Sequence, residues 1–214
     1  MKLYSYFRSS ASFRVRIALA IKQIPFEYLP VHLVRGGGQQ HSEMYRALNN
    51  DGLVPTLVHG QEVVNQSLAI IEYLNDLYPE KPLLPGNAED RAFVRSIALQ
   101  IACDVHPLNN LRVLKYLETE FSTSGEARHR WYRHWIDRGF RSLEKKLAND
   151  SRVGKFAFGD QPTLADICIV PQVWNARRFS IPLEDYPIIT RIESNAMRLD
   201  AFRSAEPSNQ VDAE

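Results

Sequence analysis

The stretch Arg8-Ser9-Ser10-Ala11-Ser12-Phe13-Arg14-Val15-Arg16-Ile17-Ala18-Leu19 decides how the chain begins to fold. It follows a short apolar run over residues 1–7, which predicts a strand, and it opens an apolar pattern at helical spacing. Serine is a good N-cap because its oxygen can accept hydrogen bonds from the free N–H groups of a first helical turn. We therefore predict a strand, a hydroxyl-rich loop and then a helix.

The charges of this stretch suit an anion. Arg14 and Arg16 fall in the first helical turns, where the helix dipole is already positive, so each costs about a few tenths of a kcal/mol unless an anion offsets it. With Arg8 beside them, the helix start is suited to a negatively charged ligand. Taken alone, the pattern agrees equally well with an ordinary serine cap and solvated arginines.

Composition limits the class of protein. The 214 residues are 44% hydrophobic and 24% charged, as in a soluble globular protein. The net charge of +1 and the lack of a basic tract argue against a nucleic-acid partner. No apolar run approaches the ~20 residues of a membrane span, and the start lacks the apolar core of a signal peptide. Two cysteines, Cys103 and Cys168, fit a reducing cytoplasm, and no Cys/His cluster has metal-site spacing.

The first part of the chain predicts a small sheet. Residues 26–30 form a second strand, which should pair in parallel with the first through a right-handed crossover. Three glycines at 36–38 predict a mobile surface loop; a phosphate loop is a poor alternative because no Gly-Lys-Ser/Thr follows. Residues 54–58 and 61–64 predict a hairpin. Pro55 cannot donate to a ladder and marks a strand start, an edge or a cis bond.

A helix with Ser67 as its N-cap closes this part. Residues 78–87 then hold three prolines and a glycine, which predicts a linker. The pattern after the linker is helical. We predict a long helix over about 88–117, kinked near Pro107, and a second helix over about 125–148.

The remaining chain also reads as helical. Thr163 and Asp166 form a capping-box pattern with Asp in place of Glu, ahead of a nearly apolar, buried helix that runs to about Asn175. Another helix begins near Pro187. The polar tail from Glu206 is expected to fray.

Several motifs together resemble one family. The opening Ser-Ser-Ala-Ser-Phe-Arg-Val-Arg-Ile-Ala-Leu is close to the zeta-class glutathione transferase signature Ser-Ser-Cys-Ser-x-Arg-Val-Arg-Ile-Ala-Leu. The resemblance spans about residues 3–200. It continues through 38–40, 53–57, 66–74, 106–114 and 170–173. It implies an α/β plus all-α fold, with a thioredoxin-like domain over 1–80, a linker at 81–87 and an all-helical domain over 88–214.

The resemblance also implies an activity. The zeta class includes maleylacetoacetate isomerases of tyrosine and phenylalanine catabolism, and a bacterial branch resembles maleylpyruvate isomerases of gentisate catabolism. Both isomerise a cis double bond with glutathione as a cofactor that is not consumed. A cytoplasmic homodimer is implied too. One departure is Ala11, which stands where the family has Cys, so a thiol there cannot be essential to this protein.

The same resemblance assigns thiol activation to Ser9 and Ser10. A serine hydroxyl is too weak an acid to serve as a base, but it can donate a hydrogen bond to a thiolate. A thiol pKa of ~8.5 falls beside a helix N-terminus and cations. Pure capping is the alternative. The positions implied to bind glutathione are Ser9, Ser10, Ala11, Ser12, Gln40, Val54, Pro55, Gln66, Ser67, His106, Asn110 and Arg112.

Within that set, Gln66 and Ser67 are expected to hold the γ-glutamyl carboxylate at a helix start. A cis Val54–Pro55 bond would let the Val54 backbone pair with the cysteinyl part, and Gln40 would reach the glycyl end. For His106, a structural role is equally open.

Arginines are expected to bind the carboxylates of the maleyl substrate, because the guanidinium fork binds a carboxylate at two points. Arg8 and Arg178 are the candidates, with Arg177 second to Arg178. Complementing the dipole of a helix end is the alternative for this pair. Arg14 and Arg16 would raise the local potential or pair with the other domain.

Two rival functions differ in class. A general glutathione transferase or α-haloacid dehalogenase would activate the same thiolate but expel a leaving group. A non-enzymatic interaction domain would be expected to lose Ser9, Gln66 and Ser67, which this chain keeps.

Overall fold

Strand β1 (Lys2–Ser5) lies at the centre of a four-stranded mixed sheet with the order β2-β1-β3-β4. Strand β2 (Glu27–Pro30) pairs with β1 in parallel, as the crossover through α1 (Ser10–Lys22) predicts. The predicted hairpin is confirmed as β3 (Thr56–His59) and β4 (Glu62–Asn65), which pair antiparallel. Pro55 precedes β3, and its bond to Val54 is cis.

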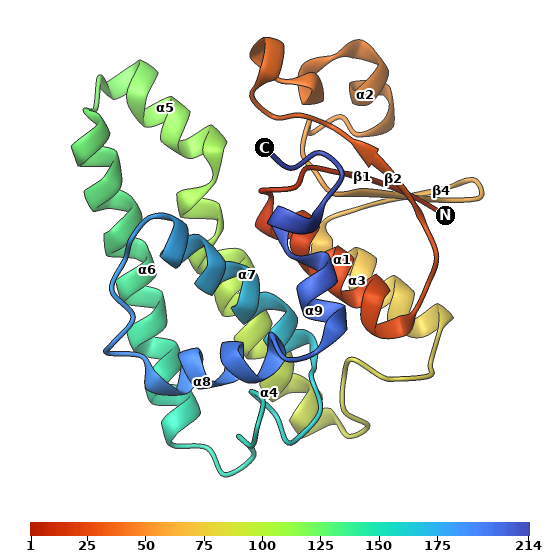
Figure 1. Cartoon of the computed structure of the whole chain (residues 1–214), viewed down its shortest axis with the longest axis vertical. Helices are drawn as coiled ribbons and strands as arrows, with labels where there is room; N and C mark the ends of the chain where they lie inside the picture. The colour runs from red at the N-terminus through yellow and green to blue at the C-terminus, as the bar shows by residue number, and fades with distance from the viewer. The chain divides into compact units, whose positions relative to one another are not determined.

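The two faces of the sheet follow from the pleat of β1. Leu3 and Ser5 point to one face, where Ser5 accepts a hydrogen bond from Arg16 of α1. Tyr4 points to the other face and contacts Tyr45 of α2 (Glu43–Leu48). Helix α3 (Ser67–Leu77) packs beside α1 (Figure 1). The sheet therefore lies between α1 with α3 on one face and α2 on the other.

Arg14 and Arg16 lie inside this unit, each 2% exposed, so solvated arginines are excluded. The Nε of Arg16 donates to the carbonyl of Ala205 at 3.0 Å, and its Nη2 donates to the carbonyl of Phe7 at 3.0 Å. Ala205 belongs to the range 88–214 that the sequence assigned to the helical domain, and in the structure it lies with the first unit.

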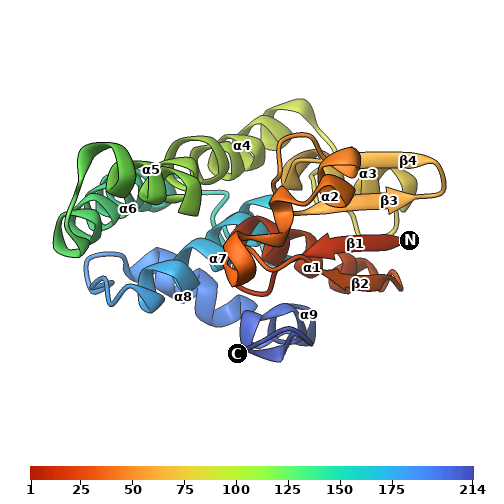
Figure 2. The same cartoon turned by 90° about the horizontal axis from the view of Figure 1, so that it is seen from above.

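The computed structural model describes all residues from 1 to 214 and divides them into two units. The first comprises Met1–Leu83 together with Met197–Glu214, and the second is Leu84–Ala196. The prediction that 88–214 forms one helical domain is therefore wrong at its end. Helix α9 (Asp200–Ala205) packs on α1, and Phe202 and Ala205 are buried there. Figures 1 and 2 show α9 beside α1.

The second unit is helical, and its largest helices start as predicted. Helix α6 spans Gly125–Ala148 and α7 spans Leu164–Arg178, with twelve buried residues in α7. Helix α8 is Pro187–Ala196. The predicted kink is a complete break: α4 (Ala88–Leu99) passes through a π-helical turn and a 3-10 turn before α5 (Leu111–Phe121).

Two features escaped sequence reasoning. The glycine loop contains 3-10 turns at Arg35–Gly37 and Gln39–His41, and α2 follows it directly with Ser42 as N-cap. The tail does not fray, because Asp212 and Glu214 bond back to the first unit.

None of the helices combines the length and hydropathy that a bilayer span requires.

Candidate functional site

The start of α1 is built around Ser9, which is its N-cap as predicted. Ser9 Oγ accepts from the backbone N–H of Ser12 at 3.2 Å, and the Ser9 carbonyl accepts from Phe13 N at 2.8 Å. Since the cap uses the oxygen as an acceptor, the hydroxyl proton of Ser9 is available for a second partner. Ser10 and Ser12 are buried, whereas Ser9 is half-exposed, so Ser9 is the serine that a ligand can reach.

The buried Ser12 is also informative. Its Oγ is fully buried and has no hydrogen-bond partner in the protein. A buried hydroxyl without a partner is uncommon. It lies in the same first turn that Ser9 caps.

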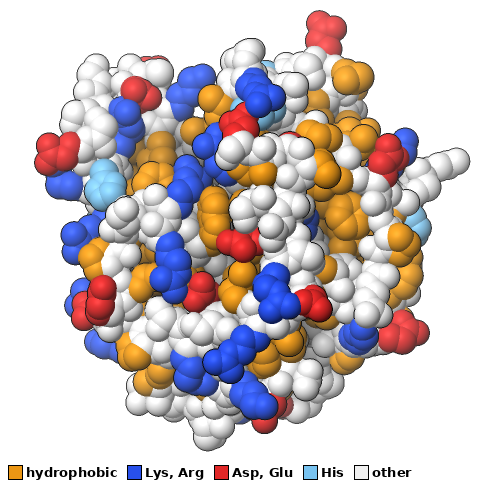
Figure 3. Space-filling model, in the orientation of Figure 1, with side chains coloured by type: hydrophobic (Ala, Val, Ile, Leu, Met, Phe, Trp, Pro, Cys, Tyr) orange, Lys and Arg blue, Asp and Glu red, His pale blue; other side chains and the backbone are white.

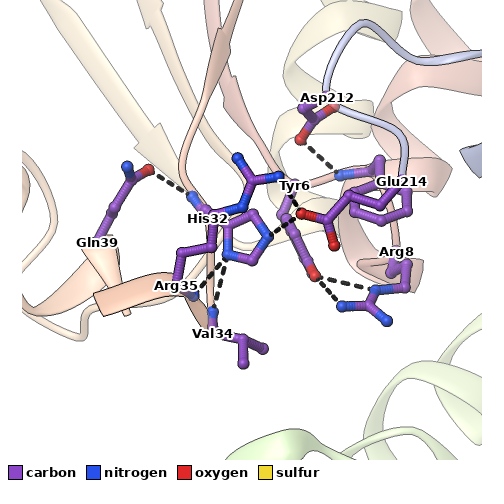
Figure 4. A network of polar contacts seen from close by, with 9 residues as sticks. Tyr6, Arg8, His32, Val34, Arg35, Gln39, Asp212 and Glu214 are labelled. Carbon is purple, nitrogen blue, oxygen red and sulfur yellow. Dashed lines mark hydrogen bonds and ion pairs between the residues drawn. The ribbon is translucent and has the colours of Figure 1, made fainter. Parts of the chain in front are cut away.

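Arg8 is oriented by a residue that the sequence analysis missed. Its Nε and Nη2 donate to the hydroxyl of Tyr6 at 2.9 and 2.6 Å, and its guanidinium lies 5.0 Å from the centre of the Phe7 ring. The Tyr6 ring is buried and meets His32 edge-on. Figure 4 shows the Tyr6 hydroxyl pointing at one edge of the Arg8 guanidinium. One edge of Arg8 is thus fixed by a buried phenol.

The start of α3 differs from the prediction. The N-cap is Gln66, at φ 70°, rather than Ser67, and no side chain caps the helix. Ser67 is the first helical residue; it is buried, and its Oγ accepts from Nη1 of Arg14 at 3.3 Å. The first turn therefore has backbone N–H groups without a side-chain cap, next to a buried arginine.

Val54 lies just before β3, and Gln40 lies in the 3-10 turn Gln39–His41. The predicted cis bond between Val54 and Pro55 is present. Gln40 is buried, and its Nε2 donates to the carbonyl of Leu33 at 3.3 Å, while its Oε1 has no partner. Nε2 of Gln40 also lies 3.2 Å from Nε2 of His41, so the side-chain amide contacts neighbours on its own loop.

In the second unit, three predicted residues surround the break before α5. Asn110 is the N-cap of α5 and accepts from the backbone N–H of Arg112 at 3.1 Å. Arg112 is exposed and His106 is half-buried. Because α5 has no acidic residue in its first turn, its start is positive, with the Arg112 side chain added.

The structure separates Arg177 from Arg178 at the end of α7. Arg177 forms an ion pair with Glu193 at 2.9 Å. The exposed guanidinium of Arg178 lies 4.8 Å from the centre of the Phe179 ring, which stacks at 3.7 Å on the buried Tyr132. Burial raises the pKa of Tyr132. Arg178 thus packs on aromatic rings, and Arg177 pairs with a carboxylate.

Comparison with known proteins identifies the family to which this chain belongs. The glutathione S-transferase N-terminal domain model matches residues 3–82, and the C-terminal domain model matches residues 112–191. The chain belongs to the glutathione S-transferase family. It is 48% identical to a probable maleylacetoacetate isomerase of Vibrio cholerae over 99% of this chain and 97% of that protein.

Two solved structures of the family are very similar. A holo maleylpyruvate isomerase, described as a bacterial zeta-class glutathione S-transferase, superposes with a TM-score of 0.97 at 45% identity, covering 100% of both chains. A maleylacetoacetate isomerase of Methylobacterium extorquens AM1, solved with malonate and glutathione, gives 0.96 at 36% identity, also covering 100% of both chains. The chain is thus a zeta-class glutathione S-transferase with the thioredoxin-like and helical units of that fold.

Basic, acidic and apolar side chains are interspersed over the face of this glutathione S-transferase in Figure 3. Two residues that contact the loop before α1, the buried Tyr6 and the half-exposed Asp212, were missed by the sequence analysis. In the sequence Tyr6 is one apolar residue of the predicted first strand. The only feature that could have indicated its role is a phenol two residues before Arg8. Asp212 gives no signal, because the residues it contacts lie about 200 positions away in the sequence.

Proposed function

We propose that this protein is a glutathione-dependent cis–trans isomerase of a maleyl oxo acid. The observation that carries the proposal is the start of α1, where the half-exposed Ser9 caps the helix with its oxygen and keeps its hydroxyl proton for a thiolate. The relatives named as isomerases support it, as does glutathione in the related Methylobacterium structure.

The residues present fit glutathione at two helix starts. The start of α3 leaves first-turn N–H groups without a side-chain cap, which suits the γ-glutamyl carboxylate. The protein itself contains an example of this arrangement. The start of α8 is bound by the carboxylate of Glu144, which accepts from Ile188 N at 2.7 Å and Ile189 N at 3.0 Å. An incoming carboxylate at α3 would play the part that Glu144 plays at α8.

When bound, glutathione supplies a thiol sulfur that can add to the cis alkene and leave again. Ser9 would donate a hydrogen bond from its hydroxyl to the thiolate, and the α1 dipole would lower the thiol pKa further. Ser10 and Ser12 would keep this turn polar. Arg8, held by Tyr6, would bind a substrate carboxylate and place positive charge near the conjugated carbonyl, where negative charge develops. Arg178 would bind the second carboxylate.

Two substrates remain, and each has support. Maleylacetoacetate, in tyrosine and phenylalanine breakdown, is our first proposal, and the Vibrio relative supports it. Maleylpyruvate is the second, because the holo maleylpyruvate isomerase superposes with a TM-score of 0.97. Malonate in the Methylobacterium structure supports a dicarboxylate in either case.

The test is an assay of both maleyl substrates with and without glutathione. We expect the trans product with glutathione recovered unchanged, and a much lower rate without glutathione. Consumption of glutathione in proportion to product would instead identify a transferase or an α-haloacid dehalogenase. A rate that does not depend on glutathione would refute the proposal.

The proposal extends to the assembly and its location. We propose a homodimer, on the strength of the family resemblance, and sedimentation of the purified protein would test it. We also propose a cytoplasmic location, which the small number of cysteines, two in 214 residues, supports.

A further inference from the structure

The backbone of Phe7 is held from both sides by charged side chains. Its N–H donates to Oδ2 of Asp212 at 3.1 Å, and its carbonyl accepts from Nη2 of Arg16 at 3.0 Å. Phe7 immediately precedes Arg8 and Ser9. A peptide fixed at both its donor and its acceptor fixes the direction in which the next residues leave it.

Asp212 is itself fixed by a second contact. Its Oδ1 accepts from the hydroxyl of Tyr28 at 2.6 Å. Tyr28 is on β2, paired with Leu3 in the sheet. The carboxylate of Asp212 therefore links a rigid strand to the loop that leads into α1.

The charges of this arrangement are matched. Arg16 is 2% exposed, and burial lowers its pKa to about 10, an effect that nearby Tyr28 and Asp212 oppose. Besides Phe7, the Arg16 guanidinium donates to the carbonyl of Ala205 and to Ser5. Asp212 thus supplies negative charge near a buried cation while holding the same peptide.

Glu214 is a contrasting carboxylate on the same tail. It contacts Nε2 of His32 at 3.2 Å and pairs with Arg35. His32 Nδ1 accepts from the backbone N–H groups of Val34 and Arg35, so its Nε2 carries the proton that is donated to Glu214. Figure 4 shows Glu214 on the His32 side of the network and Asp212 apart from it. Glu214 anchors the tail without bonding the backbone of residues 6–9.

We propose that Asp212, acting with Arg16 on the Phe7 peptide, is a positioning residue that sets the place of Ser9 and Arg8. The inference rests on the proposed function, because it assigns Asp212 to the same site. Asp212 would act through the backbone and would not touch substrate or glutathione.

The test compares D212A with the matched control E214Q and the conservative variant D212N. Three quantities are measured: the pKa of bound glutathione, from thiolate absorbance against pH; kcat/KM; and hydrogen exchange of the amides of residues 7–12. For D212A we expect a bound-thiol pKa raised by at least half a unit, kcat/KM lowered about tenfold, and faster exchange. E214Q should match the wild type in all three.

D212N should restore most of the effect, because its oxygen can accept from Phe7 and its amide can donate to the Tyr28 oxygen. If D212A does not fold, Y28F replaces it. Y28F removes the hydrogen bond to one oxygen of Asp212 and should raise the pKa of bound glutathione by less than D212A does. The proposal would be overturned if D212A left both the pKa of bound glutathione and the hydrogen exchange of residues 7–12 unchanged. If D212A does not fold, the same result in Y28F would overturn it. Equal effects of E214Q and D212A would also overturn it.

The two proposals can fail separately. If the wild-type protein lowers the thiol pKa but isomerises neither maleyl substrate, the isomerase proposal fails and the thiol titration still tests Asp212. If the wild type does not bind glutathione, the proposed function fails as a whole. The exchange of residues 7–12 then decides whether Asp212 fixes the loop.

Discussion

Two kinds of helix start occur in the molecule. In the first unit, α1 and α3 have no acidic side chain in their first turn, whereas α2 and α9 carry Glu43 and Asp200 there. In the second unit, α4, α6 and α7 each carry at least one. A helix start with its own carboxylate has its positive end neutralised, whereas the starts of α1 and α3 keep their positive charge.

Helix α7 is the clearest closed start. Asp166 accepts from the backbone N–H of Thr163 at 2.7 Å, from its hydroxyl at 3.0 Å and from Ala157 N at 2.8 Å. Helix α5 is the open start of the second unit, and it carries the predicted binding residues Asn110 and Arg112. The difference between open and closed starts therefore follows the predicted function rather than the unit.

The largest expected effect is at the open start of α1. S9A should lower kcat/KM for isomerisation about 100-fold, a loss of about 2.7 kcal/mol, because the thiolate loses its hydrogen-bond donor. S124A is the matched control, since Ser124 caps α6 by accepting from Ala127 N at 3.1 Å. Both variants should lose about 1 kcal/mol of stability. Steady-state kinetics and urea unfolding measure the two effects, and equal activity losses would remove the distinction between open and closed starts.

At the closed start of α7, a substitution of Asp166 should change the free energy of unfolding. D166N leaves donors of Thr163 and Ala157 facing an amide, so we expect a loss of about 2–3 kcal/mol in the free energy of unfolding near pH 4.5. Burial raises the pKa of Asp166 to about 6. Between the unfolded value and pH 6 the folded state binds the proton more tightly, so wild-type stability falls as pH rises. The advantage of the wild type over D166N should therefore shrink by at least about 1 kcal/mol by pH 7.

Asp150 provides the control for that pH series. A hydrogen bond from Arg152 lowers the pKa of Asp150 to about 2, so this carboxylate stays ionised from pH 4.5 to 7. The stability difference between the wild type and D150N should be constant over this range. An unchanging D166N difference in urea unfolding would contradict the role given to burial.

The next effect in size is expected at the end of α7, where Arg178 and Arg177 should differ in their influence on the KM of the maleyl substrate. R178A should raise the KM of the maleyl substrate about 30-fold, near 2 kcal/mol, since a charge-assisted contact to a carboxylate is lost. R177A should change it less than about twofold, because its exposed pair with Glu193 contributes little. The KM for glutathione should stay within about twofold in both. A larger effect of R177A on the substrate would reverse the assignment.

The smallest effect comes from closing an open start. A69E places a carboxylate in the first turn of α3, where it should stabilise the helix by up to about 1 kcal/mol. The same carboxylate should compete with glutathione and raise its KM about fivefold. A127E makes the equivalent change in α6 and should alter stability only. A glutathione KM that A69E leaves unchanged would count against α3 as the carboxylate site.

Local signals in the sequence were enough for the sheet and the main helices. The periodicity of residues 125–148 gave the bounds of α6, and Thr163 with Asp166 gave the start of α7. Helix α2 was missed because it is only six residues long and follows a glycine loop. The break before α5 is larger than a kink because Pro107 lacks the N–H that would continue the helix.

The candidate site was predictable wherever a local motif or the family resemblance reached it. Ser9 as the cap of α1 and the cis bond before Pro55 are examples. Ser67 was misplaced as a cap because its hydroxyl is used by Arg14, a contact 53 residues away that no local pattern reveals. Asp212 acts only through such distant contacts, whereas Tyr6 contacts Arg8, two residues along the chain.

The discontinuous first unit sets an order for synthesis on the ribosome. Residues 84–196 are made before residues 197–214, so the second unit has all its residues while the first still lacks α9. Until then Arg16 has no acceptor at Ala205, and the Phe7 peptide has no Asp212. We therefore expect a nascent chain stalled before residue 197 to hold a folded helical unit and a first unit that a protease can still cleave.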